Sequence, residues 1–167
     1  MVLQILTLPK EKEGTDNMKI RTDYVTNSSS SSFILGFNNM DEIPEVAHEL
    51  PSYWSEDAKQ TVVSDIEDGI TSKDNVKTFN KDHISRWDMV FKGKKYWDMT
   101  REEINSEEFK NFVENEKETL SEQFEKELSE YDIVSIVEYE DHTDFGSMME
   151  HNIMPNLLCT IKRISHH

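Results

Sequence analysis

The hydrophobic residues are spaced most regularly between Ser106 and Tyr131. Ser106 is a typical N-cap residue, and the glutamates that follow it suit the positive end of the helix dipole. The remaining positions include nine glutamates and only three lysines, so the pattern predicts one long amphipathic helix with an acidic outer face. The apolar residues recur every three, four or seven positions, which places them on one helix face: Phe109, Phe112, Val113, Leu120, Phe124, Leu128 and Tyr131.

Three stretches with strand-like patterns predict a sheet. "SFILGF" (residues 32–37) is a short apolar run, "DIVSIVEYE" (132–140) alternates between apolar and polar residues, and "NLLCTIKRIS" (156–165) follows a connecting loop. Together with the helices, they predict an α+β fold. We expect a small, mostly antiparallel sheet with helices on one face, including the long acidic helix.

Two shorter helices are predicted after the first strand. "MDEIPEVAHEL" (residues 40–50) has apolar residues at helical spacing and is followed by Pro51, which cannot continue a helix. "SEDAKQTVVSDIEDG" (55–69) has Ser55 as its N-cap and Gly69 at its C-terminal end.

The periodicity fades between residues 71 and 100, except in "MVFKGKKYW" (89–97). This stretch predicts two short strands around a Lys-Gly-Lys turn. A patch of basic and aromatic residues can stack on and hold single-stranded nucleic acid. An amphipathic hairpin with tryptophans inside and lysines outside is the interpretation that we favour. The patch comprises Arg86, Trp87, Lys92, Lys94, Lys95, Tyr96 and Trp97.

The segment before Met18 has the features of a translated leader. The codons for "KEKEG" (residues 10–14) can contain a ribosome-binding sequence at the usual bacterial distance from a Met18 codon. The apolar start lacks the basic region and cleavage site of a secretory signal, and it is too short to span a bilayer. We therefore expect residues 1–17 to lie outside the core and residues 18–167 to form a single domain. The alternative is a strand at Val2–Leu8.

The next segment carries a resemblance to known sequences. "RTDYVTNSSSSSF", Arg21 to Phe33, resembles the RTDFVTNSSSSSF-type N-terminal segment of uncharacterised bacterial, phage and mobile-element proteins. It differs at Tyr24, where phenylalanine is commoner. The resemblance is confined to this segment, which precedes dissimilar sequences. It implies a bacterial or mobile-element origin and no particular chemistry.

The serine run at the end of this segment is a candidate phosphate-binding loop. Its backbone amides can cradle an anion, but the run lacks the glycines and the lysine of a P-loop. A flexible loop, typical of serine-rich segments, is therefore the favoured interpretation. The candidate phosphate-binding residues are Ser28, Ser29 and Ser30.

The formal net charge of −16 limits the possible partners. A field of this sign repels nucleic acid and anionic membranes, so we expect neither direct DNA binding nor membrane association. It attracts a basic protein surface, including that of a host protein which normally holds nucleic acid. The alternative is an acidic surface that only keeps the protein soluble.

The single cysteine, Cys159, excludes a disulfide within the chain. It lies in an apolar run, so we expect a buried structural thiol. This is typical of a protein in the reducing cytoplasm.

The loop "EYEDHTDFGSMMEHNIMP" contains the candidate metal ligands. Carboxylates and imidazoles so close in sequence can converge on a divalent ion. No metal motif of known spacing is present, and a hydrogen-bonded connecting loop is the alternative. His166 and His167 follow the next strand, and antiparallel pairing of that strand with residues 133–139 would place them at the opposite end of the sheet. The candidate ligands are Asp141, His142, Asp144, Glu150 and His151.

Two functions are compatible with these features. The first is a cytosolic protein-binding or inhibitor module that uses its acidic helix to occupy a basic surface. The alternative is a small metal-dependent hydrolase in which the 141–151 loop activates a metal-bound water. No catalytic residue is assigned. The candidate partner-binding residues lie off the apolar stripe of the long helix: Glu107, Glu114, Glu118, Glu122 and Glu125.

Overall fold

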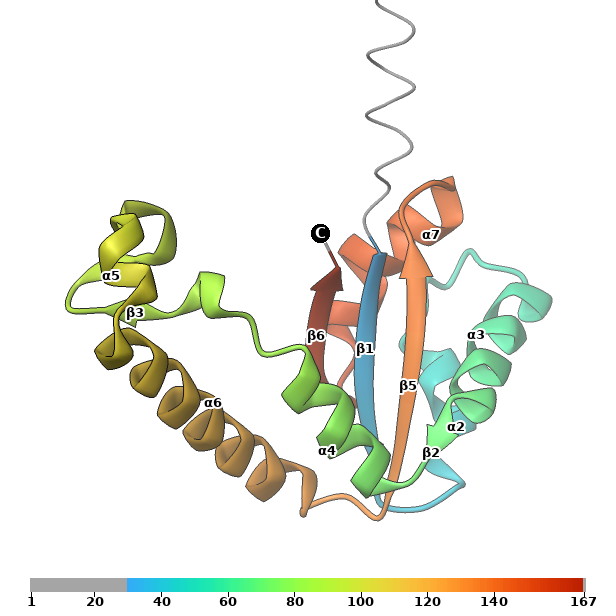
Figure 1. The fold of residues 1–167 in the computed structure, drawn as a ribbon. Coiled ribbons are helices and arrows are strands. Elements are labelled where there is room, and N and C mark those ends of the chain that lie inside the picture. Colours follow the sequence, from blue (N-terminus) through green and yellow to red (C-terminus); the bar gives the residue numbers. More distant parts are fainter. Residues whose placement is uncertain (1–29, 167) are drawn as a thin grey trace, which may run out of the picture.

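The structure, a computed structural model, describes residues 30–166 (Figure 1). The predictions for residues 1–17, including the alternative strand at Val2–Leu8, lie outside this range. The same holds for Ser28, Ser29 and His167. Within the described residues, the chain folds into a central sheet, helices that pack on it, and a small lobe that projects from one side.

The sheet has four strands, and every neighbouring pair is antiparallel. Three of the strands were predicted, and the short fourth one pairs only with β5. The α+β class and the small antiparallel sheet are therefore confirmed. In the order β2-β5-β1-β6, the strands are β2 (Ile70–Thr71), β5 (Ile133–Glu140), β1 (Ser30–Phe37) and β6 (Thr160–His166).

One face of the sheet is covered by α2 (Glu42–Glu45) and α3 (Glu56–Asp68). Phe33, Leu35 and Phe37 of β1 point to this face and are fully buried there. The predicted helix at 55–69 is confirmed as α3. The helix predicted at 40–50 is shorter, because α2 changes into a 3₁₀ turn at Val46–His48. From the helices, this core receives Ile43, Val46, Val62, Val63 and Ile66.

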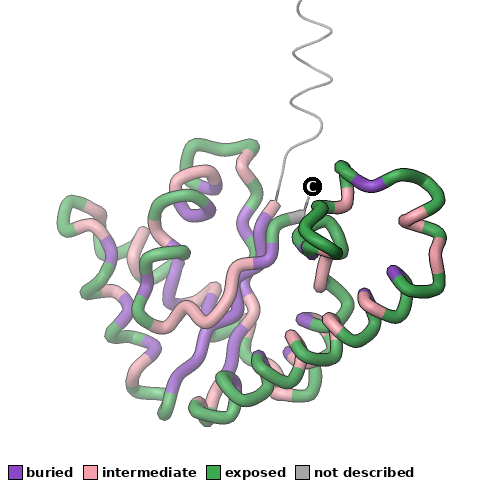
Figure 2. The backbone as a smooth tube through the Cα atoms, turned by 90° about the vertical axis from the view of Figure 1, so that its left-hand side faces the viewer, coloured by how far each residue is buried: buried purple, intermediate pink, exposed green. Residues whose placement is uncertain are grey.

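The other face is covered by α4 (Lys73–Asp82) and the C-terminal half of α6 (Glu107–Leu128). Ile34 of β1 is buried there with residues of both helices, Val76 and Leu128 among them. Helices thus cover both faces, which corrects the expectation of one. The reason lies in β1, whose apolar run leaves no polar side to face water. β1 is buried along almost its whole length, and Figure 2 shows buried strand segments at the centre of the fold.

The predicted long helix is confirmed as α6, which begins after Ser106. The Ser106 hydroxyl accepts a hydrogen bond from the Phe109 amide at 3.2 Å, so it caps the helix as expected. Phe109 and Val113, in the first half of α6, pack in the projecting lobe. Phe124 and Leu128, in the second half, pack against the sheet. The helix therefore connects the two cores (Figure 1).

The lobe has a small core of its own. It contains a hairpin of β3 (Val90–Phe91) and β4 (Lys94–Lys95), followed by α5 (Arg101–Asn105) and the start of α6. A capping box at Thr100 and Glu103 begins α5. The buried residues of the lobe are Met89, Met99, Phe109 and Val113.

The hairpin was predicted correctly, but the direction of its aromatic side chains was not. Its turn passes through positive φ at Gly93 (78°), a conformation that glycine adopts without strain. Trp87 is 52% exposed and Trp97 is 59% exposed, whereas Phe91 packs on Phe109 at 5.3 Å between ring centres. The tryptophans therefore face outward, and the smaller phenylalanines fill the lobe core.

Cys159 is half-buried against the core on the sheet face that α2 and α3 cover, so the expected burial of its thiol is only partial. Burial raises the pKa of the Cys159 thiol to about 12, and the nearby Glu49 carboxylate adds to this effect. The thiolate is the reactive form. At pH 8 we expect iodoacetamide to alkylate the native protein about a thousandfold more slowly than the urea-unfolded chain, measured by mass spectrometry. Native alkylation within tenfold of the unfolded rate would contradict this.

Candidate functional site

The loop that carries the candidate metal ligands folds tightly over the end of β5. It begins with α7 (Asp144–Met148), which Thr143 caps by accepting a hydrogen bond from the Gly146 amide at 2.9 Å. A Cβ atom on Gly146 would lie 1.9 Å from the Glu140 carbonyl oxygen, so only glycine permits this close approach. A π-helical turn at Met149–Ile153 follows. This turn carries Glu150 and His151 back towards the strand end.

Glu150 is completely buried, and one of its oxygens is held from two strands. Its Oε1 accepts hydrogen bonds from the Ser31 hydroxyl at 2.7 Å and from Arg163 Nη2 at 3.0 Å. Arg163 Nε also donates to the Ser31 hydroxyl at 3.1 Å. Because β1 provides Ser31 and β6 provides Arg163, the sheet fixes the orientation of this carboxylate.

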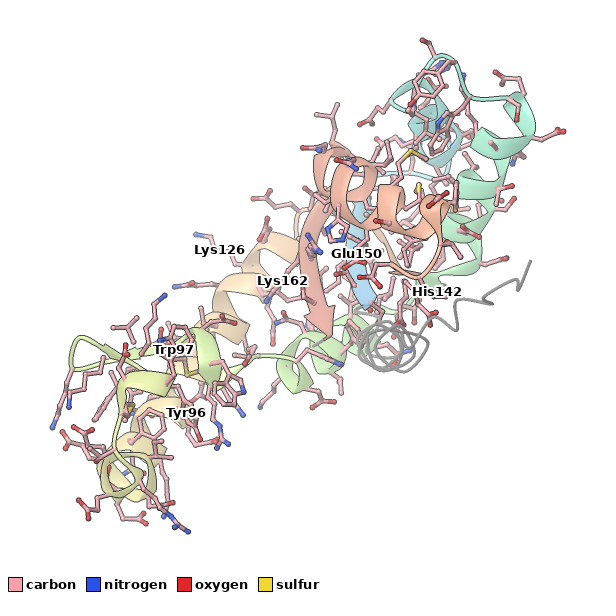
Figure 3. All side chains as sticks on the ribbon, turned by 90° about the horizontal axis from the view of Figure 1, so that it is seen from above. Tyr96, Trp97, Lys126, His142, Glu150 and Lys162 are labelled. Carbon is pink, nitrogen blue, oxygen red and sulfur yellow. The ribbon has the colours of Figure 1, made fainter. Side chains whose placement is uncertain are left out.

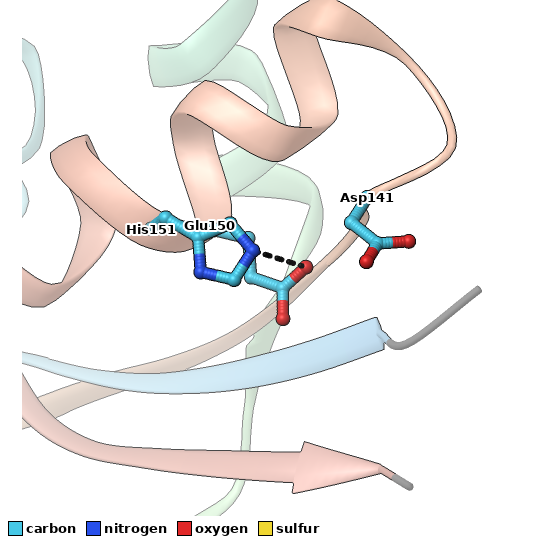
Figure 4. Close-up of side chains that lie close together, drawn as sticks. All are labelled: Asp141, Glu150 and His151. Carbon is cyan, nitrogen blue, oxygen red and sulfur yellow. Dashed lines mark ion pairs between the residues drawn. The ribbon is translucent and has the colours of Figure 1, made fainter.

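The other oxygen of Glu150 has no hydrogen-bond partner within the described residues. His151 Nε2 lies 3.9 Å from Glu150 Oε2, too far for a hydrogen bond. Three side chains of this loop, those of Asp141, Glu150 and His151, each offer one ligand atom. These three atoms lie within 4.8 Å of one another (Figure 4). We call these three residues the carboxylate–imidazole cluster. Asp141 and His151 lie at its rim, and Glu150 forms its base.

The remaining two candidate ligands do not join this cluster. His142 is exposed, and its Nδ1 lies 2.8 Å from Glu140 Oε2. Asp144 is exposed in the first turn of α7. The structure therefore brings together three of the five predicted side chains.

The antiparallel pairing of the last strand with residues 133–139 is wrong, and so is the position of His166 that followed from it. β1 lies between β5 and β6, so β6 runs in the same direction as β5 and ends at the same end of the sheet. Ser30 pairs with both Glu140 and His166. The backbone of His166 is thus near the end of β5, where the loop begins. Ser30 belongs to the strand ladder, and its role in phosphate binding stays a prediction.

The candidate partner-binding glutamates form a single surface on α6. All five are exposed, and their spacings of three, four and seven residues place them on one helix face. Glu107 pairs with Lys110 at 2.7 Å and Glu125 with Lys77 at 3.6 Å. Within the described residues, no ion pair joins the other three to a basic side chain. We call this surface the acidic face: Glu107, Glu114, Glu118, Glu122 and Glu125.

A groove of about 1050 Å³ separates the lobe from the edge strand β6, and sequence analysis did not predict it. No periodic signal could have indicated it, because its walls come from segments far apart in the chain. Burial lowers the pKa of Lys162, and the charge of Glu127 partly opposes this. Figure 3 shows Tyr96 and Trp97 on the lobe, well apart from Glu150 and His142 at the sheet. The lining includes Trp87, Val90, Glu116, Leu120 and Lys162.

The described chain is an α+β protein with two candidate sites, the carboxylate–imidazole cluster and the acidic face. Among the described residues, no helix combines the length and apolar character needed to cross a bilayer. No protein-family model, curated protein or solved structure matches this chain. Its function is therefore argued from the geometry of these sites.

Proposed function

We propose that this protein binds a basic surface of another protein through the acidic face of α6. The proposal rests on Glu114, Glu118 and Glu122, which are exposed and have no ion pair within the described residues. Like charges four residues apart repel each other and lower helix stability. This arrangement is therefore unfavourable for folding alone. Lysines and arginines of a partner would relieve the repulsion and speed the encounter.

The dimensions of the acidic face suit an extended contact. At about 1.5 Å per residue, it reaches about 27 Å from Glu107 to Glu125. Glutamates four residues apart are about 6 Å apart along the helix. Such a row of negative charge is complementary to a surface that normally holds the phosphates of a nucleic acid. We therefore propose a nucleic-acid-binding protein as the partner and inhibition by occupation as the mode of action.

Replacing Glu114, Glu118 and Glu122 with glutamine tests this function. We expect unchanged or slightly higher stability, because two repulsive pairs are removed. Association with the basic partner should weaken about tenfold, on the scale of three exposed charge contacts. Its dependence on salt should also flatten. The partner is captured from a host lysate, identified by mass spectrometry and titrated with both proteins at several salt concentrations.

A control variant separates the acidic face from net charge. Replacing Glu67, Glu102 and Glu138 with glutamine removes the same charge from exposed positions outside α6. This variant should bind the partner nearly as well as the unaltered protein. Equal loss in both variants would mean that only net charge matters. Full binding by the α6 variant would contradict the proposed function.

The metal-dependent hydrolase is supported by a smaller ligand set than expected. Asp141, Glu150 and His151 converge, while His142 and Asp144 lie elsewhere on the surface. None of the three converging residues lines the groove beside β6. Their arrangement supports ion binding more directly than a reaction, and the acidic face remains the better-supported basis for function.

A further inference from the structure

We propose that the carboxylate–imidazole cluster is a binding site for one divalent transition-metal ion, with Asp141, Glu150 and His151 as its ligands. Ligand atoms about 2.1 Å from one ion lie at most about 4.2 Å apart. The three atoms already lie within 4.8 Å of one another. His151 is exposed and Asp141 is partly exposed, so these two side chains can make the shifts of about 1 Å that bring the three atoms to the separation of adjacent ligands, about 3–3.5 Å.

Glu150 supplies the second, independent observation. A buried carboxylate oxygen without a hydrogen-bond partner is costly, and Glu150 Oε2 is such an atom within the described residues. Figure 4 shows this oxygen directed towards His151 and Asp141. A cation between the three side chains would satisfy it. The cluster therefore has a fixed acceptor at its base as well as two acceptors at its rim.

Ser31 and Arg163 act as positioning residues for this acceptor. They hold Glu150 Oε1 at 2.7 Å and 3.0 Å, so the carboxylate cannot rotate freely. Outer partners of this kind orient metal ligands in many proteins. Arg163 also offsets one negative charge, which limits the attraction for a cation. We therefore expect affinity in the micromolar range rather than the nanomolar range.

The donor set indicates the class of ion. Two carboxylates and one imidazole suit Mn²⁺ or Zn²⁺, whereas Ca²⁺ and Mg²⁺ are usually held by oxygen atoms alone. Three protein ligands leave further coordination positions for water. A bound ion would also tie the end of β5, at Asp141, to the π-helical turn. The protein should therefore melt at a higher temperature when the ion is present.

Calorimetric titration of the metal-free full chain with MnCl₂, and separately with ZnCl₂, tests the site. We expect one ion per chain with a micromolar dissociation constant. Asp141→Asn and His151→Ala should each weaken binding at least about tenfold. His142→Ala and Asp144→Asn are matched controls from the same loop and should change affinity less than about twofold. Melting curves with and without Mn²⁺ should follow the same order.

Three results would overturn the proposal. The first is no binding up to millimolar metal, and the second is equal loss in the His142 or Asp144 controls, which indicates general attraction to acidic surface. The third is loss of binding only when His166 and His167 are replaced, since β6 ends at the same end of the sheet. Glu150→Gln removes the ligand at the base of the cluster and should also weaken metal binding. If this variant does not fold, Asp141→Asn still tests the site, because Asp141 lies at the rim of the cluster.

Discussion

Replacing Phe33 with alanine is expected to lower the free energy of unfolding by about 3–5 kcal/mol. Phe33 is completely buried in the central strand, and the Arg163 guanidinium lies 5.8 Å from its ring centre. The substitution removes a large apolar side chain and leaves a cavity between the sheet and the helices on one face. Urea unfolding followed by circular dichroism measures the loss.

Phe145→Ala is the matched control for this prediction. Phe145 is 37% exposed and touches Trp54 and Tyr139 at ring-centre distances of 5.8 and 6.3 Å. Because water already reaches this side chain, its removal should cost much less than the loss of Phe33. If the two variants lose equal stability, Phe33 is not at the centre of the core.

Replacing Phe109 with alanine is expected to open the lobe and leave the sheet folded. Phe109 is 3% exposed and contacts Phe91, Tyr96 and Phe112. The lobe has few buried residues, so a loss of about 3–5 kcal/mol exceeds what its remaining contacts can supply. Native-state hydrogen exchange should show lost protection for amides in residues 86–105 and retained protection in β1 and β5.

Trp97→Ala provides the comparison within the same lobe. Trp97 is largely exposed, so its removal should leave exchange in the lobe almost unchanged. If Phe109→Ala instead removes protection from β1 and β5 to the same extent, the lobe and the sheet unfold together. That result would support the prediction of a single domain over residues 18–167.

The elements predicted correctly are those whose period is visible in the sequence. α6 has apolar residues over its whole length, and β5 alternates clearly. α4 was missed because its buried residues are few: Val76 and Asn80 are the ones fully enclosed. The two-sided packing of β1 was also missed. A short apolar run shows that a strand is buried, but it does not show which helices cover each face.

The metal candidates show a similar limit. Asp141, Glu150 and His151 lie close in sequence, so their convergence was within reach of sequence reasoning. Ser31 lies 119 residues before Glu150. Both Ser31 and Arg163 donate hydrogen bonds to the Glu150 carboxylate. Only strand pairing brings these residues together, and that pairing also placed His166 at an unexpected end of the sheet. A linear motif cannot reveal partners that the sheet assembles.

The central position of β1 affects how the protein is made. Ser30 pairs with Glu140 on one side and with His166 on the other, so both partners of β1 are translated long after it. The core of the lobe contains only residues between Ile84 and Leu120, so it depends on contacts closer in sequence and can form earlier. Until β5 and β6 leave the ribosome, "SFILGF" remains an unpaired apolar segment that can aggregate. Nascent chains that end before β5 should therefore bind chaperones, and release should follow completion of β6.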